Sequence, residues 1–140
     1  GVEVAVGCYN ANPASMKAAV QLLAQSGAKR KRIAVLGDML ELGPNAAQMH
    51  EEVGDFVARH GIEQLVACGP LGRSLAKGAK QAGLDQAHIL EVPDARAASA
   101  AIKTFVKPGD TVLIKASRGM KLELVADALQ GATHTTRKAS

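Results

Sequence analysis

Short apolar segments and longer amphipathic segments alternate along the whole chain. The apolar segments are rich in Val, Ile, Leu and Ala, and they are Val2–Val6, Ile33–Gly37, Gln64–Cys68, His88–Val92 and Thr111–Lys115. Continuous apolar runs of this length are typical of strands that are covered on both faces, as in a parallel sheet. The pattern therefore predicts five buried strands.

The segments between these runs space their apolar residues by three and four positions, which is the spacing of one helix face. The predicted faces are Met16, Ala19, Val20 and Leu23; Met49, Val53, Phe56 and Val57; Leu71, Leu75, Ala79 and Ala82; Ala98, Ile102 and Phe105; and Leu122, Val125, Ala126 and Leu129. The third face is the weakest, because Gly72 and Gly78 interrupt it. Asn12–Pro13 has the form of a helix cap followed by proline at the first helical position.

The alternation of strand and helix predicts an α/β fold, a Rossmann-like, doubly wound, mainly parallel sheet of five to six strands flanked by helices. Residues 1–130 are expected to form one domain. Residues 131–140 are small and polar and have no periodicity, which predicts a disordered tail. In such a sheet the loops that follow the strands gather at the carboxyl edge, where ligands bind.

Composition narrows the classes of function. The 140 residues are 47% hydrophobic and 21% charged, as in an ordinary soluble protein, and no apolar run is long enough to insert into a membrane. Aromatic residues make up only 2% of the chain, which argues against stacking on single-stranded nucleic acid. Cys8 and Cys68 end apolar segments and are expected to be small buried hydrophobes in a reducing, cytoplasmic compartment.

The net charge of +4 comes partly from the run Lys29–Arg32. A run of this kind usually caps a helix end or forms a solvated loop, and no nucleic-acid-binding motif accompanies it. Binding to nucleic acid through this run is therefore the weakest of the functional readings.

The first post-strand loop carries two asparagines, Asn10 and Asn12. Asn12 is expected to cap the helix that follows. Asn10 is not at the cap, and its amide can both donate and accept hydrogen bonds. It is expected either to bond its own backbone in a turn or to contact a nucleotide base, a sugar hydroxyl or a peptide group.

Two further loops bring charged groups to the same edge. The carboxylates Asp38 and Glu41 could hold a substrate ammonium, position a basic residue, contact a metal or simply be solvated. Lys115, Ser117 and Arg118 combine two cations, a hydroxyl and the start of a helix, which suits a carboxylate or a phosphate. The alternative is that Lys115 and Arg118 pair with Asp38 or Glu41 across the edge.

Several motifs are missing from the sequence. It has no G-x-x-x-x-G-K-[ST], no G-x-G-x-x-G and no G-x-S-x-G, so it encodes no complete ATP cradle, dinucleotide fingerprint or nucleophile elbow. The four histidines have no metal-ligand spacing. His50, two residues before Glu52, is expected on a polar surface or at the border of a site.

Four stretches carry a resemblance to a known family: CYNANPASM (8–16), IAVLGDMLELG (33–43), HEEVG (50–54) and VLIKASRGMKLELV (112–125). Together they resemble the Mur ligase family, and within it the ligases that add D-alanyl-D-alanine to UDP-N-acetylmuramoyl-tripeptide, a precursor of peptidoglycan. The resemblance covers nearly all of residues 1–130, in order.

This resemblance implies an enzyme of three domains that uses ATP and Mg²⁺, forms an acyl phosphate and lets the dipeptide amine attack it. The chain is similar to the third domain, which closes over the site. The N-terminal domain would hold the UDP-sugar, and the central domain would hold ATP and Mg²⁺. The resemblance puts Asn10 and Asn12 on the nucleotide side. It puts Asp38, Glu41, Lys115, Ser117 and Arg118 on the dipeptide side, with no catalytic residue on this chain.

Three positions depart from the family pattern. The family commonly has D-D-x-Y-N-A-N-P where this chain has Val6 and Gly7, and an Asp at position 7 would be expected to contact the ribose. The family's K-G-S-R is K-A-S-R here, with Ala116 in place of glycine. The departure at Gly7 gives some weight to a second reading, a stand-alone non-catalytic module that binds a small anionic metabolite or a partner protein.

Overall fold

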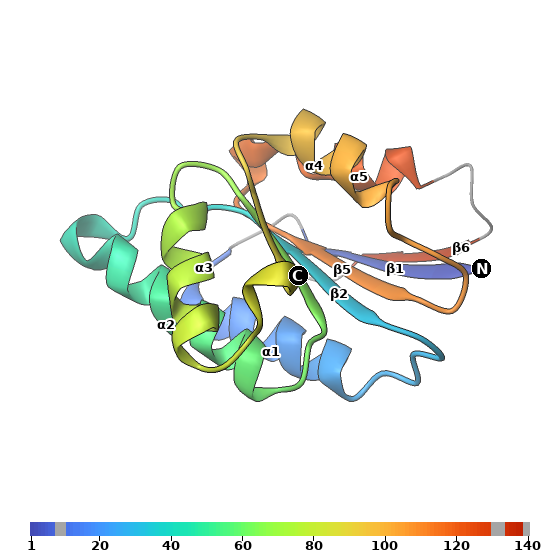
Figure 1. The fold of residues 1–140 in the computed structure, drawn as a ribbon. Helices are drawn as coiled ribbons and strands as arrows, with labels where there is room; N and C mark the ends of the chain where they lie inside the picture. Colours follow the sequence, from blue (N-terminus) through green and yellow to red (C-terminus); the bar gives the residue numbers. More distant parts are fainter. Residues whose placement is uncertain (8–10, 130–133, 139–140) are drawn as a thin grey trace.

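The computed structural model describes residues 1–7, 11–129 and 134–138, which form one sheet with helices on both faces (Figure 1). Six parallel strands lie in the order β4-β3-β2-β5-β1-β6. They are β1 (Val2–Gly7), β2 (Arg32–Leu36), β3 (Gln64–Cys68), β4 (Ile89–Val92), β5 (Thr111–Lys115) and β6 (His134–Lys138). The predicted α/β class is confirmed, and the five predicted strands begin and end within one residue of the observed ones.

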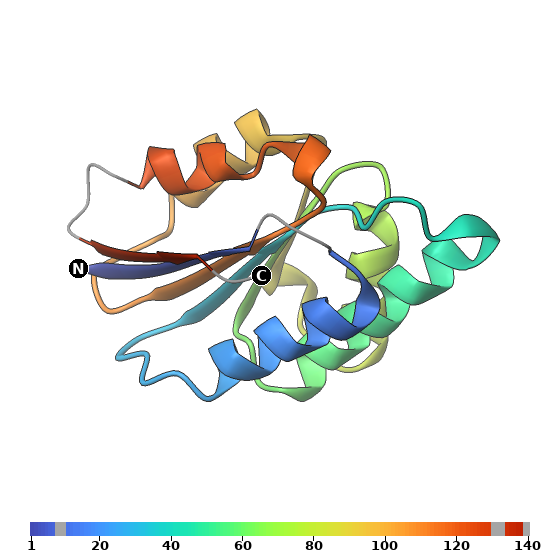
Figure 2. The same cartoon turned by 180° about the vertical axis from the view of Figure 1, so that it is seen from behind.

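The helices divide between the two faces of the sheet. They are α1 (Pro13–Ala24), α2 (Ala46–Arg59), α3 (Gly72–Gln81), α4 (Ala95–Ile102) and α5 (Glu123–Ala128), with short 3₁₀ helices at Gly43–Asn45, Gln86–His88 and Arg118–Met120. Figures 1 and 2 show α1, α2 and α3 below the sheet and α4 and α5 above it. The chain is therefore doubly wound, as the sequence predicts.

Alternate residues of each strand fill two apolar layers. The layer under α4 and α5 contains Val4, Val35, Val112, Ile114, Ala98, Ile102 and Val125. The layer under α1, α2 and α3 contains Leu36, Leu65, Leu113, Met16, Val20, Val53 and Leu75. Because both faces of the sheet are covered, the strands read as continuous apolar runs in the sequence.

Local capping explains where α1 begins. The side-chain oxygen of Asn12 accepts a hydrogen bond from the Ser15 amide at 2.9 Å, and the Ser15 hydroxyl accepts one from the Asn12 amide at 3.1 Å. This reciprocal pair is a capping box, and Pro13 fixes the backbone at the first helical position. The predicted cap is confirmed.

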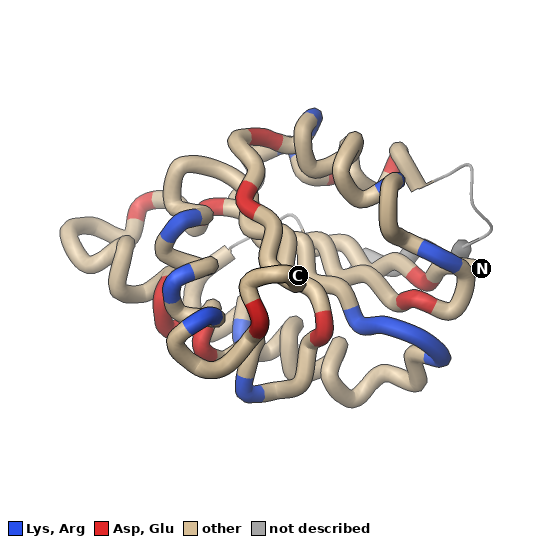
Figure 3. Tube along the Cα trace, viewed as in Figure 1, with Lys and Arg blue, Asp and Glu red and all other residues tan. Residues whose placement is uncertain are grey.

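The basic run Lys29–Arg32 lies at the amino end of the sheet, near the N-terminus (Figure 3). One guanidinium nitrogen of Arg30 lies 2.7 Å from each carboxylate oxygen of the buried Asp110. The same carboxylate also accepts hydrogen bonds from the amides of Lys31 and Lys107.

Arg32, the last residue of the run, donates to the carbonyls of Leu23 and Ser26 at the end of α1. These two arginines therefore have structural roles, one of them the predicted capping of a helix end.

Strand β6 lies within the segment for which the sequence predicts a disordered tail. It pairs in parallel with β1, with Val2 opposite His134 and Val6 opposite Lys138. The pairing is made by main-chain hydrogen bonds, so it requires no apolar periodicity in the sequence. Thr135 and Thr136 are β-branched and therefore favourable in a strand. The difference thus arises because an edge strand needs no apolar pattern of its own.

Helices α2 and α3 cross at very close range over two glycines. A Cβ atom added to Gly78 would overlap the carbonyl oxygen of Glu51, and one added to Gly54 would overlap the carbonyl oxygen of Leu75. Gly78, one of the two glycines that weaken α3 as a sequence pattern, is thus required by the packing of the two helices.

We expect Gly78→Ala to lower the free energy of unfolding by about 1–3 kcal/mol, because the added methyl group must push the helices apart. Gly27→Ala is the matched control, since a Cβ at Gly27 has no atom within 4 Å. Chemical denaturation measures both variants. Equal stabilities for the two would contradict the close helix contact.

Cys68 ends β3 inside the layer under α4 and α5, with no exposed surface. Burial, and to a smaller extent the negative charges of Asp94 and Asp38, raise the pKa of its thiol from 9.0 to about 11. The prediction that Cys68 is a small buried hydrophobe is confirmed. Cys8 lies outside the described residues.

The Cys68 thiol should therefore resist alkylation in the folded protein. In a Cys8→Ser background at pH 8, we expect iodoacetamide to react at least about a hundredfold more slowly with the native chain than with the urea-unfolded chain. A rise from 9.0 to about 11 leaves about a hundredfold less thiolate at this pH, and burial slows the reaction further. Similar rates in the two states would contradict this account.

Candidate functional site

The carboxyl ends of β1, β2 and β5 meet at the centre of the sheet. Strand β5 lies between the other two, so Lys115 is opposite both Gly7 of β1 and Leu36 of β2. The helices that follow β1 and β2 pack below the sheet, whereas α5, which follows β5, packs above it (Figure 1). The loops therefore diverge at this point, which is the switch point at which open α/β sheets bind ligands.

The loop after β2, residues 37–42, is held from two sides at this switch point. The Leu40 amide donates to the Ser117 hydroxyl at 2.9 Å, and the Ser117 amide donates to the Asp38 carbonyl at 3.1 Å. On the other side, the Met39 amide donates to Nε2 of His50 at 3.0 Å. Main-chain groups of the loop are thus bonded to the β5 loop and to α2.

The two carboxylates of this loop have different surroundings. Asp38 is only 4% exposed, and its Oδ1 accepts a hydrogen bond from the Leu71 amide at 3.0 Å, which joins the loops after β2 and β3. Glu41 is exposed, and its φ of 60° lies in the left-handed region. Asp38 is therefore not a solvated surface acid, while Glu41 presents a carboxylate to solvent at the edge.

The β5 loop contributes groups of three kinds. Lys115 is completely buried and, by alternation with Leu113, lies on the side of the sheet covered by α1, α2 and α3. Ser117 is partly buried and bridges to residues 38 and 40. Arg118 begins the short 3₁₀ helix, and its side chain lies outside the described part of the chain. The edge thus brings Asp38, Lys115 and Ser117 together.

The β1 loop is described only in part. Asn12 is exposed, and the oxygen of its amide is already engaged with the Ser15 amide. Asn10 lies outside the described residues. Gly7 is buried at the end of β1, where its carbonyl accepts from the Ala116 amide at 3.4 Å. A glycine at this position offers no side chain to a ligand.

Of the two placements that the sequence left open for His50, a polar surface is wrong, whereas the border of a site stays a prediction. The side chain has no exposed area, and the α2 face is turned so that His50, Val53 and Val57 are buried while Met49 and Phe56 are half-buried. The sequence does contain a signal for the burial of His50, because residues 50, 53 and 57 are spaced by three and four positions, as on one face of a helix.

Among the described residues, no group of three or more His, Cys, Asp or Glu side chains could hold a metal ion. No helix among them is long and apolar enough to cross a membrane.

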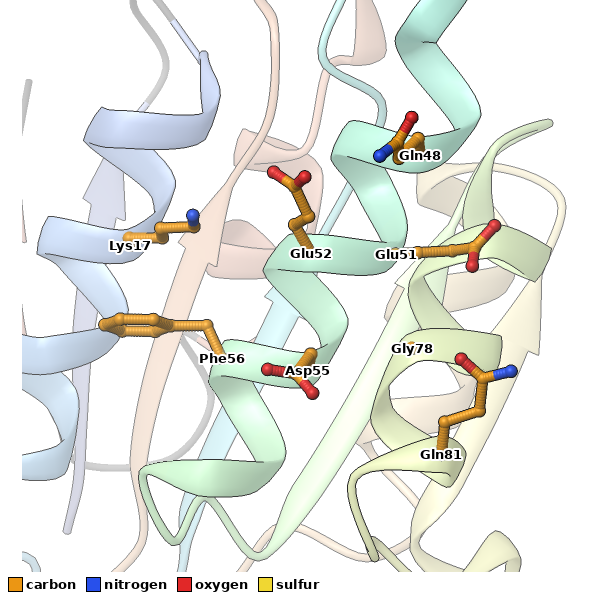
Figure 4. A pocket seen from close by; sticks show the side chains of 8 residues that line it. All are labelled: Lys17, Gln48, Glu51, Glu52, Asp55, Phe56, Gly78 and Gln81. Atoms are coloured by element: carbon orange, nitrogen blue, oxygen red, sulfur yellow. The ribbon is translucent and has the colours of Figure 1, made fainter.

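A surface depression of about 350 Å³ lies away from this edge, over α1, α2 and α3 (Figure 4). Lys17 and Phe56 lie between α1 and α2, whereas Gln81 comes from α3. Its acids Glu51 and Asp55 pair with Lys77 and Arg59 of the same helices, at 3.7 and 2.9 Å. These pairs engage two of the three acids that line the depression, so we assign no site here.

Comparison with known proteins gives a consistent result. The family described as "Mur ligase, glutamate ligase domain" matches residues 1–118. UDP-N-acetylmuramoyl-tripeptide--D-alanyl-D-alanine ligase of Bacillus subtilis is 37% identical over 93% of this chain and 28% of its own length. The enzyme of the same name from Mycobacterium tuberculosis is 39% identical over 92% of this chain and 29% of its own.

Solved structures agree with the sequences. A crystal structure of MurF from Acinetobacter baumannii superimposes with a TM-score of 0.76 and 27% identity, covering 88% of this chain and 27% of that one. MurF ligase from Thermotoga maritima in complex with ADP gives 0.70 and 26%, covering 89% and 27%. The chain thus spans less than a third of the length of these relatives, and it belongs to the Mur ligase family.

Proposed function

We propose that this chain is the C-terminal, substrate-closing domain, residues 1–130, of an ATP-dependent ligase that joins D-alanyl-D-alanine to UDP-N-acetylmuramoyl-tripeptide. One observation carries the proposal: more than nine-tenths of the chain matches relatives of that name at 37–39% identity. The N-terminal and central domains of the longer protein would hold the UDP-sugar and most of the nucleotide.

The loops after β2 and β5 are the proposed dipeptide side. A dipeptide zwitterion needs cations and N–H donors for its carboxylate and an acceptor for its amine. Glu41 offers an exposed acceptor at this edge. Lys115 is the last residue of β5, and Ser117 and Arg118 lie in the loop that follows it. Asp38 contributes mainly by bracing its loop, because its Oδ1 is engaged with the Leu71 amide.

The β1 loop is the proposed nucleotide side, with Asn10 and Asn12. The Asn12 oxygen serves the helix cap, so its NH₂ group is the part that remains for a nucleotide. Gly7 supplies no carboxylate for a ribose. We propose that this chain makes a smaller share of the nucleotide contacts than family members with Asp at this position.

We assign Mg²⁺ and the phosphates of ATP mainly to the central domain, because the sequence of this chain contains no phosphate-binding loop. The role proposed for this chain is to bring the dipeptide amine against the acyl phosphate and to exclude water, which would otherwise hydrolyse it.

The full-length protein that carries this chain should release phosphate from ATP only when both UDP-N-acetylmuramoyl-tripeptide and D-alanyl-D-alanine are present. The chain alone should be inactive, because it has no phosphate cradle of its own. A coupled phosphate assay together with mass spectrometry of the product measures both. Ligation by the chain alone would overturn the proposal. Dipeptide binding without turnover by the full-length protein would favour a non-catalytic module.

The same assay has a matched pair of variants. Glu41→Gln should raise the KM for the dipeptide about three- to tenfold, since it removes the charge from a hydrogen bond to an ammonium group. Glu52→Gln removes an exposed carboxylate from α2, away from the edge, and should change this KM by less than about twofold. Equal effects of the two substitutions would count against the proposed dipeptide side.

A further inference from the structure

His50 is a buried polar side chain with two main-chain partners. It lies on α2 with no exposed area, its Nδ1 is 2.6 Å from the Ala46 carbonyl oxygen, and its Nε2 is 3.0 Å from the Met39 amide nitrogen. A carbonyl oxygen only accepts and an amide N–H only donates. Nδ1 must therefore carry the proton and Nε2 must be bare, so the two partners together fix one neutral tautomer.

The hydrogen bond to Met39 fixes the middle of loop 37–42. The Met39 side chain is itself buried, at 1% exposure, in the layer under α1, α2 and α3. The next residue, Leu40, is held through its amide by Ser117 of the β5 loop. Consecutive amides of the loop are therefore held by two different elements, one on each side.

Glu41 has a backbone conformation that needs support from its surroundings. Its left-handed backbone, with φ of 60°, is unfavourable for a residue with a side chain and persists only where the surroundings impose it. The fixed amides of Met39 and Leu40 directly precede it. Without the Met39 link, the loop would be held through Ser117 and through the contact of Asp38 with Leu71.

We propose that His50 is a positioning residue for the dipeptide, which acts by holding loop 37–42 so that Glu41 faces the substrate amine. The inference rests on the proposed function. It predicts an effect on the dipeptide and not on the nucleotide, because the loop that His50 holds is on the dipeptide side of the edge.

Two substitutions separate the hydrogen bonds of His50. In His50→Asn the amide nitrogen can take the place of Nδ1 and donate to Ala46, but nothing reaches Met39. In His50→Gln the longer side chain can place its carbonyl oxygen where Nε2 was and accept from Met39. Each variant keeps one of the two bonds, so we expect their melting temperatures to fall by similar amounts.

In the full-length ligase, we expect His50→Asn to raise the KM for D-alanyl-D-alanine about tenfold, the factor that corresponds to one hydrogen bond of about 1.4 kcal/mol. The KM for ATP should change by less than about twofold. His50→Gln should restore the dipeptide KM to within about twofold of the wild-type value. A purely structural role would instead lower the active fraction and would not separate the two substrates.

Three kinetic results would overturn the inference: an unchanged dipeptide KM in His50→Asn, equal rises in both KM values, or a His50→Gln variant as impaired as His50→Asn.

The imidazole ¹⁵N chemical shifts of His50, measured on the chain itself, test the geometry independently of activity. Chemical shifts typical of the Nε2-protonated tautomer or of the imidazolium would also contradict the inference. A wild-type full-length protein without ligase activity, but with the expected tautomer, would instead refute the proposed function and the role inferred from it.

Discussion

The parallel pairing of β5 between β1 and β2 is the interaction on which the rest of the structure depends. It brings Gly7, Leu36 and Lys115 side by side although they are distant in sequence, and it puts three post-strand loops at one point of the carboxyl edge. A slip of one residue in β5 would exchange its two faces, exposing Lys115 to the other apolar layer and separating Ser117 from the β2 loop. The register therefore determines both the core and the candidate site.

Several side chains at this edge hold its loops in place and leave another side chain exposed. Asp38, Ser117 and His50 all bind main-chain groups, and together they join four elements: the loops after β2, β3 and β5, and helix α2. Such bonds hold a loop in a defined conformation without occupying the exposed carboxylate of Glu41. A domain that closes over a substrate needs this arrangement, because a loop placed with an error of about 1 Å loses much of the benefit of proximity.

The sequence predicts the repeating elements of this fold well, because strands covered on both faces and amphipathic helices leave periodic apolar patterns. It also predicts that the loops at residues 38–41 and 115–118 reach the same edge. It does not predict the partners of Asp38, His50 or Asp110, since these are mostly main-chain amides of segments distant in sequence. Strand β6 escapes prediction for a related reason, because main-chain pairing at an edge needs no apolar pattern.

The proposed dipeptide site, at the edge formed by the β2 and β5 loops, is tested most directly by titrating the ¹⁵N-labelled chain with D-alanyl-D-alanine. The account predicts that amide shifts concentrate at residues 38–42 and 115–119 and that these shifts are reduced in Glu41→Gln. Shifts that concentrate instead at the depression over α1, α2 and α3, around Lys17, Glu52 and Gln81, would contradict it.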